Sequence, residues 1–162
     1  MKSVVRWLDE YSMAHKNPTN QTVHWICVPL IYWSVYAALA SIPVPSWFVV
    51  GDFVVHYGLI AIVLIQLYYF ALSFRLGLAM LIFNVLMVLA TNLLVSVLPL
   101  PLWQVAIAVF VLAWIGQFIG HNIEGSRPSF FKDLLFLLIG PLWLMSKLMR
   151  RFGLWPAPAH GQ

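Results

Sequence analysis

Two long stretches without a charged side chain constrain the fold of this chain more than any other sequence feature. Between Lys16 and Asp52 lie 35 residues without Asp, Glu, Lys or Arg, and between Arg75 and Glu124 lie 48. A helix needs about 20 apolar residues to cross a bilayer, so the longer stretch can hold two such helices and a turn. Only 9% of the 162 residues are charged, whereas a soluble domain carries about a quarter. The sequence therefore predicts an integral membrane protein.

Turn-forming residues divide the apolar sequence into four predicted membrane-spanning helices. Pro43 and Pro45 end the first helix, because proline cannot continue a helix, and Arg75 marks the turn after the second. Pro99 and Pro101 separate the last two helices. The predicted fold is all-α, a polytopic membrane helical bundle that forms a single membrane-embedded domain over residues 1–162. The four spans are expected at residues 25–42, 55–74, 76–98 and 102–120.

Two further helical segments are expected outside the spans. Residues 3–15 place Val4, Leu8, Tyr11 and His15 on one stripe, which is typical of an amphipathic helix lying on the membrane surface. The apolar stretch at residues 134–145 is interrupted by a Gly-Pro pair and is too short to span. It is therefore predicted to be a short interfacial or re-entrant helix.

The distribution of basic residues predicts the orientation. With four spans, all nine lie on the side of the two termini and of the turn near residue 75, and the opposite loops at 43–54 and 99–101 hold none. Such a bias places both termini in the cytoplasm. The nine residues are dispersed along the chain and form no basic face, so no nucleic-acid partner is expected. They are Lys2, Arg6, Lys16, Arg75, Arg127, Lys132, Lys147, Arg150 and Arg151.

A first polar cluster precedes the first predicted span and contains His15, Asn20 and His24. Thr19 or Asn20 can cap the helix that begins here, because both side chains accept hydrogen bonds from free backbone N–H groups. Asn20 and His24 are four residues apart and therefore share a helix face. The cluster is expected at the cytoplasmic boundary of the membrane.

A second polar cluster follows the fourth predicted span. Gln117 and His121 are four residues apart, and Glu124 is three residues further on, so one helix face presents an imidazole and a carboxylate together. This cluster has the same predicted depth as the first one. The two clusters can therefore form one site, to which imidazoles and a carboxylate would attract zinc, iron or manganese.

Simpler interpretations stay open for these residues. A histidine at a membrane boundary can be an interfacial hydrogen-bonding group, and Glu124 can form a surface ion pair with Arg127, which contributes little. One rival function is a haem-binding membrane anchor in which His24 and His121 are the axial ligands. Another is a non-catalytic lipid-binding protein whose histidine clusters bind headgroups.

Several other residues are expected to be structural. His56 lies at the opposite face from the two clusters, and Cys27 is expected in the core. Gly116 and Gly120 form a small-xxx-small pair, which indicates close helix packing. Asn84 is expected to form hydrogen bonds between helices. Four tryptophans near the ends of the apolar segments are expected to anchor the membrane interfaces: Trp25, Trp47, Trp103 and Trp143.

The two polar clusters resemble the signatures of the Mpo-type 2-hydroxy fatty acid dioxygenase family of fatty acid α-oxidation. The first signature is His-x-Asn-Pro-x-Asn-x-x-x-His-x-x-x-Val-Pro-Leu, at residues 15–30. The second is Gln-Phe-Ile-Gly-His-Asn-Ile-Glu-Gly-Ser-Arg-Pro, at residues 117–128. The run at 125–131 and the Leu-Leu-Ile-Gly-Pro-Leu run at 137–142 resemble the bacterial branch. That branch would place the chain in a bacterial inner membrane, whereas a eukaryotic origin would place it in the endoplasmic reticulum.

The resemblance implies an Fe(II)-dependent dioxygenase that uses O2 to shorten a 2-hydroxy fatty acid by one carbon. It assigns metal binding and catalysis to His15, His24, His121 and Glu124. Asn20 and Arg127 are expected to contact the substrate, and charge matching would pair the arginine with the substrate carboxylate. The acyl tail is expected between the spans, in contact with membrane lipids.

Overall fold

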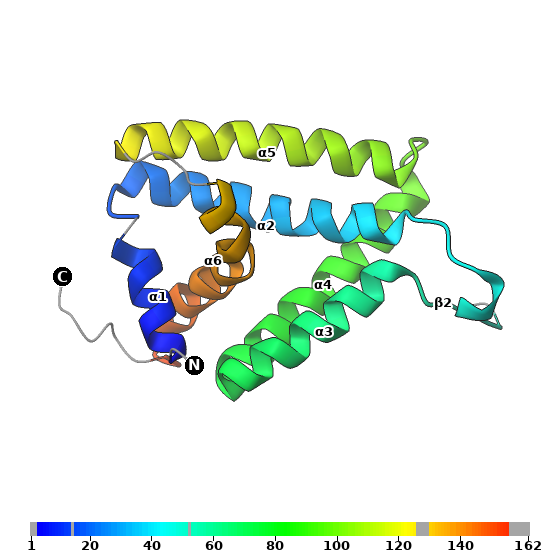
Figure 1. The fold of residues 1–162 in the computed structure, drawn as a ribbon, viewed down its shortest axis with the longest axis horizontal. Helices are drawn as coiled ribbons and strands as arrows, with labels where there is room; N and C mark the ends of the chain where they lie inside the picture. The colour runs from blue at the N-terminus through cyan, green and yellow to red at the C-terminus, as the bar shows by residue number, and fades with distance from the viewer. Residues whose placement is uncertain (1–2, 14, 52, 126–129, 156–162) are drawn as a thin grey trace.

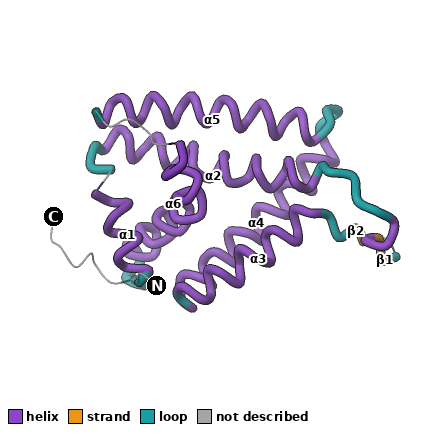
Figure 2. Tube along the Cα trace, in the orientation of Figure 1, coloured by secondary structure: helices purple, strands orange, loops and turns teal. Residues whose placement is uncertain are grey.

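The computed structural model describes residues 3–13, 15–51, 53–125 and 130–155, and these residues form an all-helical fold (Figures 1 and 2). The all-α part of the predicted fold class is confirmed. A short 3₁₀ turn, η1 (Ser46–Phe48), and a hairpin of two antiparallel strands, β1 (Val49–Val50) and β2 (Phe53–Val54), connect the second and third helices. The helices are α1 (Val4–Met13), α2 (Pro18–Ala40), α3 (Tyr57–Leu72), α4 (Phe74–Val97), α5 (Leu102–Glu124) and α6 (Phe130–Arg151).

Helix α2 is the central element of the fold, because it contacts α3, α5 and α6. Figure 1 shows α2 and α5 running side by side in opposite directions, with the α3–α4 hairpin crossing them at an angle. Helices α1 and α6 pack on each other at the end where α2 begins and α5 ends. The residues that start α2 and finish α5 therefore meet at one end of the bundle.

Two glycines on α5 allow it to approach α2 closely. A Cβ atom at Gly116 would lie 2.6 Å from the Sγ atom of Cys27, and one at Gly120 would collide with the Oδ1 atom of Asn20. The predicted small-residue packing is therefore confirmed. Cys27 is buried in the core, also as predicted.

Three of the four predicted spans are long and apolar enough to cross a membrane, namely α2, α4 and α5. Helix α3 has 16 residues, which gives a length of about 24 Å against a hydrocarbon core of about 30 Å. It is shorter than predicted because His56 caps its start, with Nδ1 accepting from the N–H of Leu59, and because Ser73 is extended and caps α4 instead. His56 is thus structural, as predicted.

Helix α2 begins at Pro18, seven residues before the predicted span. The predicted cap at Thr19 or Asn20 is wrong, because the side chain of Asn17 caps the helix by accepting from the backbone N–H groups of Thr19 and Asn20. Pro18 occupies the first turn, where its missing N–H leaves no hydrogen bond unmade. This early start carries His24 into a continuous helix.

Helix α6 is longer than the predicted interfacial segment and continues through Pro141 over 22 residues. Its inner face is buried against α1, α2 and α4. The Tyr69 hydroxyl donates to the carbonyl of Leu138 (2.8 Å), close to the turn whose hydrogen bonds the proline disturbs. The interfacial role predicted for Trp143 is wrong, because this side chain is fully buried between the helices.

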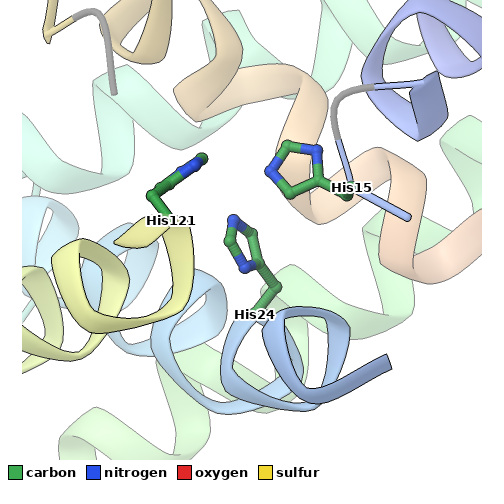
Figure 3. A group of neighbouring side chains, drawn as sticks. All are labelled: His15, His24 and His121. Atoms are coloured by element: carbon green, nitrogen blue, oxygen red, sulfur yellow. The ribbon is translucent and has the colours of Figure 1, made fainter. Parts of the chain in front are cut away.

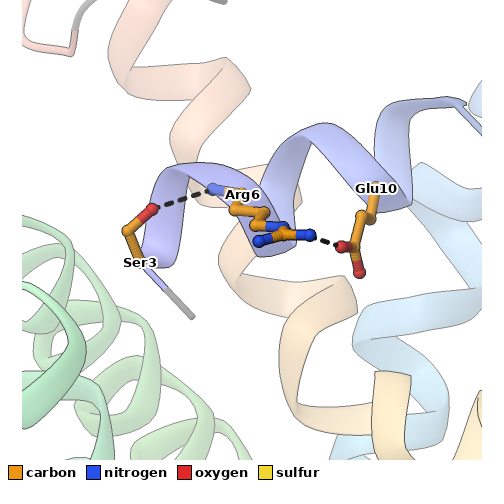
Figure 4. A network of polar contacts seen from close by, with 3 residues as sticks. All are labelled: Ser3, Arg6 and Glu10. Atoms are coloured by element: carbon orange, nitrogen blue, oxygen red, sulfur yellow. Dashed lines mark hydrogen bonds and ion pairs between the residues drawn. The ribbon is translucent and has the colours of Figure 1, made fainter. Parts of the chain in front are cut away.

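The predicted amphipathic helix at the N-terminus is α1. Leu8 and Tyr11 are buried against α6, and the Trp143 indole N–H donates to the Ser12 hydroxyl (2.7 Å). The opposite face carries an ion pair between Arg6 and Glu10 (3.4 Å), drawn in Figure 4 together with the hydrogen bond from the Arg6 N–H to Ser3. This ion pair is exposed and contributes little stability, so α1 is held by its packed face.

Candidate metal centre

Three histidines from three separate segments meet where α2 begins and α5 ends. His15 lies in the turn between α1 and α2, His24 lies within α2, and His121 lies in the last turn of α5. Their side chains are 5%, 1% and 8% exposed, so all three are removed from solvent. The two sequence signatures, about 100 residues apart, thus form a single site.

The three imidazoles point toward one common space (Figure 3). One nitrogen from each ring lies within 4.8 Å of the others. The ring centroids are 4.3 Å apart for His15 and His24, 5.3 Å for His15 and His121, and 5.2 Å for His24 and His121. Nitrogen ligands bound at about 2.0–2.1 Å to one ion are at most about 4.2 Å apart, so a small inward movement would complete a metal site.

In His15 and His24, a hydrogen bond at Nδ1 leaves the other ring nitrogen, Nε2, available for a metal. His15 Nδ1 lies 2.7 Å from the Tyr11 carbonyl, and His24 Nδ1 lies 2.9 Å from the Asn20 carbonyl. A carbonyl only accepts, so Nδ1–H donates in both rings and Nε2 carries the lone pair. The Nε2 atom of His15 is buried without a hydrogen-bond partner. Metal-ligating histidines are oriented in this way, by donating their other N–H to a carbonyl.

Burial also keeps His15 in the form that a metal ion requires. Loss of solvent around the ring lowers the pKa of His15 below its usual value, so the imidazole is neutral at neutral pH. The ring of Tyr11 stacks on it at 4.2 Å with an angle of 10° between the planes, and Trp143 packs beside it at 5.7 Å. The aromatic residues therefore hold the ring in place and exclude water.

Glu124 lies at the edge of the site, and its carboxylate is occupied by three donors. The backbone N–H of Lys16 donates to one oxygen (2.8 Å), and the backbone N–H of Asn17 donates to both (2.9 and 3.1 Å). The Asn20 side-chain N–H donates as well (3.0 Å). Among the described residues, the group whose ligand atoms gather is the three histidines, and Glu124 is outside it. Its contacts attach the segment that carries His15 to the end of α5.

Of the two residues predicted to bind substrate, Asn20 lies among the described residues. Asn20 is fully buried between α2 and α5, with its side chain bonded to Glu124 and its oxygen facing Gly120. Arg127 lies outside the described residues.

A lysine that the sequence signatures do not include lies beside the site. The Lys147 Nζ atom donates to the Gln21 side chain (2.6 Å), whose own N–H donates to the His15 carbonyl (2.8 Å). The same Nζ atom sits 4.0 Å above the Trp143 ring, and burial lowers the pKa of Lys147. Local sequence carries no signal for this contact, because α6 reaches the site only through tertiary packing.

A small, mainly apolar cavity of about 40 Å³ adjoins the histidines. This volume is well below the usual range of small-molecule sites, about 300–1,000 Å³, so a larger ligand would have to move the lining side chains apart. Its polar lining includes His24, His121 and Gln117, and the rest of its wall is aromatic and aliphatic. The site therefore combines a group of potential metal ligands with a small, mainly apolar cavity.

The haem alternative fits this geometry poorly. In a haem protein the porphyrin plane would lie between the rings of His24 and His121, with each ring bound to one face of the iron. The ring centroid of His15 lies 4.3 Å from that of His24 and 5.3 Å from that of His121, so a porphyrin would have to fit beside this imidazole. The three-histidine group is instead suited to a single metal ion.

Comparison with known proteins identifies the family. The model of a family described as 2-hydroxy-palmitic acid dioxygenase Mpo1-like matches residues 1–152. This chain belongs to the Mpo1-like family. A relative in Saccharomyces cerevisiae, the 2-hydroxy-palmitic acid dioxygenase MPO1, is 26% identical over 148 residues, which cover 90% of this chain and 79% of the relative. No solved structure matches the chain.

The family resemblance of the two signatures is confirmed, and assignment to a bacterial branch stays a prediction. In this Mpo1-like protein the two signatures supply all three buried histidines of the metal group. Other parts of the site, namely Tyr11, Trp143 and Lys147, lie outside the signatures.

Proposed function

We propose that this protein is an Fe(II)-dependent dioxygenase that cleaves the C1–C2 bond of 2-hydroxy fatty acids with O2. The product would be a fatty acid one carbon shorter, as in α-oxidation. The observation that carries the proposal is the buried group of His15, His24 and His121 beside an apolar cavity, in a chain that belongs to a dioxygenase family.

The donor set and the reaction together favour iron. Imidazole ligands suit zinc, copper, iron and nickel, whereas manganese prefers oxygen ligands. Zinc has no redox chemistry, and a dioxygenase has to exchange electrons with O2. An Fe(II) ion, when bound, would supply this redox chemistry and orient the substrate hydroxy acid and O2.

The protein residues would hold and shield this centre. His15, His24 and His121 are the proposed metal ligands. Glu124 was predicted as a fourth ligand, but its three hydrogen-bond donors favour a positioning role in which it holds the Lys16–Asn17 backbone and Asn20. Such outer partners orient metal ligands and affect metal affinity by about 10–100-fold.

A positive charge is available for the substrate carboxylate. The ammonium group of Lys147 is linked to the His15 carbonyl by the Gln21 side chain and lies over the Trp143 ring. We propose that this ammonium group pairs with the substrate carboxylate. Such charge-assisted hydrogen bonds are about twice as strong as neutral ones. Arg127 remains a second predicted partner of the carboxylate.

The membrane setting is part of the proposal. Helices α2, α4 and α5 would span the bilayer, and α3 would be a shorter fourth span. The charge distribution would place both termini and the histidine group at the cytoplasmic surface. A fatty acid could then enter from the lipid phase while its head group reaches the metal.

Metal analysis combined with an activity assay tests the proposal. The purified protein is expected to bind about one equivalent of iron and to convert 2-hydroxypalmitic acid under O2 to the acid one carbon shorter. His24→Ala and His121→Ala should lose iron and turnover. His56→Ala is the matched control, because this histidine caps α3 and belongs neither to the three-histidine group nor to the lining of its cavity, and it should keep both.

Three results would contradict the proposal. They are full activity in either ligand variant, turnover without iron, or lipid binding with neither metal nor turnover. The last result would support the non-catalytic lipid-binding alternative. A Soret band in the purified protein would support the haem alternative.

A further inference from the structure

The side chain of Gln117 has a buried oxygen that nothing in the described protein satisfies. Its Oε1 atom has no hydrogen-bond partner, and the residue is 6% exposed. Gln117 lies one turn before His121 on α5 and lines the same cavity as His24 and His121. Buried polar groups without partners are rare because they destabilise the fold, so a bound ligand is the natural partner.

The chemistry of this atom restricts the ligand group that it can bind. An amide oxygen accepts hydrogen bonds and needs a donor. At neutral pH a fatty acid carboxylate has only acceptors, whereas a hydroxyl group on the next carbon has a donor. Among the other cavity-lining residues, Val28, Ile31 and Leu137 offer no side-chain hydrogen bond, and the donors of Tyr11 and Trp114 are not bonded to the Gln117 oxygen.

We infer that Gln117 is a specificity-determining residue that accepts a hydrogen bond from the 2-hydroxyl group of the substrate. The inference rests on the proposed function, because it assumes that a 2-hydroxy acid occupies this cavity. A site built to bond a hydroxyl group discriminates strongly against the analogue that lacks it. Gln117 would therefore separate 2-hydroxy acids from ordinary fatty acids before any chemistry begins.

The test measures binding without turnover. Affinities for 2-hydroxypalmitic acid and palmitic acid are compared under nitrogen, in the iron-loaded wild type and in Gln117→Met, which keeps the side-chain length. We expect the variant to lose about tenfold of its affinity for the hydroxy acid, to bind palmitic acid as before and to retain its iron. Gln104→Met is the matched control, because Gln104 is exposed at the far end of the same helix, and it should behave as wild type.

Each other outcome overturns the inference. If Gln117→Met weakens both acids equally, the side chain has a structural role. If it binds both as the wild type does, the hydroxyl group is recognised elsewhere, and if iron is lost, Gln117 belongs to the metal site. Failure of the proposed function can be recognised separately, because the wild-type protein would then make no product once O2 is admitted.

A different observation points to the path of the acyl chain. A second small apolar cavity of about 40 Å³ lies between α2, α3 and α6, and Leu137 lines both this cavity and the one at the histidines. Along α2 the two cavities extend from His24 to Leu39, and 15 residues of helix rise about 22 Å. This distance is close to the length of an extended palmitoyl chain.

We propose that the acyl chain follows α2 along the linings of both small cavities, widening them and displacing the side chain of Leu137 where they meet. Ala61 lines the second cavity from α3, and Val63 lies two residues further along the same helix with 57% of its surface exposed. Ala61→Phe should therefore obstruct the tail of a long acid and leave a short one unaffected. Val63→Phe adds a similar bulk outside the cavity and is the matched control.

Binding of 2-hydroxy acids of increasing length under nitrogen tests the path. Each buried methylene contributes about fourfold in affinity, so Ala61→Phe should lose about that factor for every methylene it displaces, and only for long acids. Equal weakening of short and long acids, no change, or the same shift in Val63→Phe would overturn the proposal. A wild type that binds long acids but makes no product under O2 would contradict the proposed function alone.

Discussion

Glu124→Gln offers a quantitative test of whether Glu124 positions the metal site or belongs to it. The carboxylate accepts from the backbone of Lys16 and Asn17 and from the Asn20 side chain. The glutamine side chain has the same shape and keeps one accepting oxygen. Its N–H₂ group is itself a donor, however, and would face the donors that bonded the second carboxylate oxygen. Hydrogen bonds to a charged group contribute about 1.5–3 kcal/mol each and neutral ones about 0.5–1.5 kcal/mol, so three contacts would lose about 1 kcal/mol each.

Solvent reduces this sum, because the bond from Lys16 is exposed and water can replace part of it. We therefore expect the free energy of unfolding to fall by about 2 kcal/mol. For a chain of this size that corresponds to a decrease in Tm of about 4–8 °C. Circular dichroism of the metal-free protein in detergent measures this change.

Metal titration then separates the two roles. As a positioning residue, Glu124→Gln should weaken iron binding by about 10–100-fold, because the Lys16 segment that carries His15 is held less firmly. Excess iron should restore turnover, whereas His121→Ala should stay inactive at every iron concentration. If Glu124→Gln behaves like His121→Ala, Glu124 is a ligand and the positioning argument is refuted. Unchanged stability and affinity would refute the assigned hydrogen bonds.

Three further predictions follow from other contacts. Lys147→Met should raise KM for a 2-hydroxy acid by about tenfold with unchanged iron content, because the substrate carboxylate loses its partner. Steady-state kinetics would measure this change, and an unchanged KM would exclude the pairing. Gly120→Val should prevent the close approach of α2 and α5 at Asn20 and so reduce Tm and iron content together, whereas the same change at the exposed Gly51 hairpin position should leave iron content unaffected. Burial lowers the pKa of His56, so its protonation is less favourable in the folded state. The free energy of unfolding should therefore fall as the pH drops below about 6.5, where the histidine of the unfolded chain gains its proton first. His56→Asn keeps a side chain that can cap α3 and should show a smaller fall between pH 7.5 and 5.5.

The candidate metal ligands could be found without coordinates. His15, His24 and His121 stand out because polar residues are sparse in an apolar chain and because helical spacing relates them to Asn20, Gln117 and Glu124. The role of Glu124 could not be read in the same way. A carboxylate near histidines resembles a ligand in sequence, and only the donors around it, from residues more than 100 positions away, reveal what it bonds.

The ends of the elements were harder to predict than their existence. Apolar length indicates that a helix exists, but the start of α2 depended on whether Asn17, Thr19 or Asn20 supplied the cap, and all three are suitable side chains. The shortening of α3 likewise depended on Ser73 adopting an extended backbone and capping the next helix. Such choices between equivalent local partners are made by the surrounding packing.

The amino-acid sequence by itself determined the all-helical class, the apolar helices and the histidines, because hydrophobic burial and helical periodicity act over short stretches of chain. Tertiary structure alone decided which aromatic and charged residues enclose the histidines. Trp143 and Lys147 reach the site because α6 packs against α1 and α2, through contacts such as the one from Trp143 to Ser12 across 131 positions. A contact of that separation leaves no periodic pattern in the sequence, since its energy exists only once both helices have folded and met.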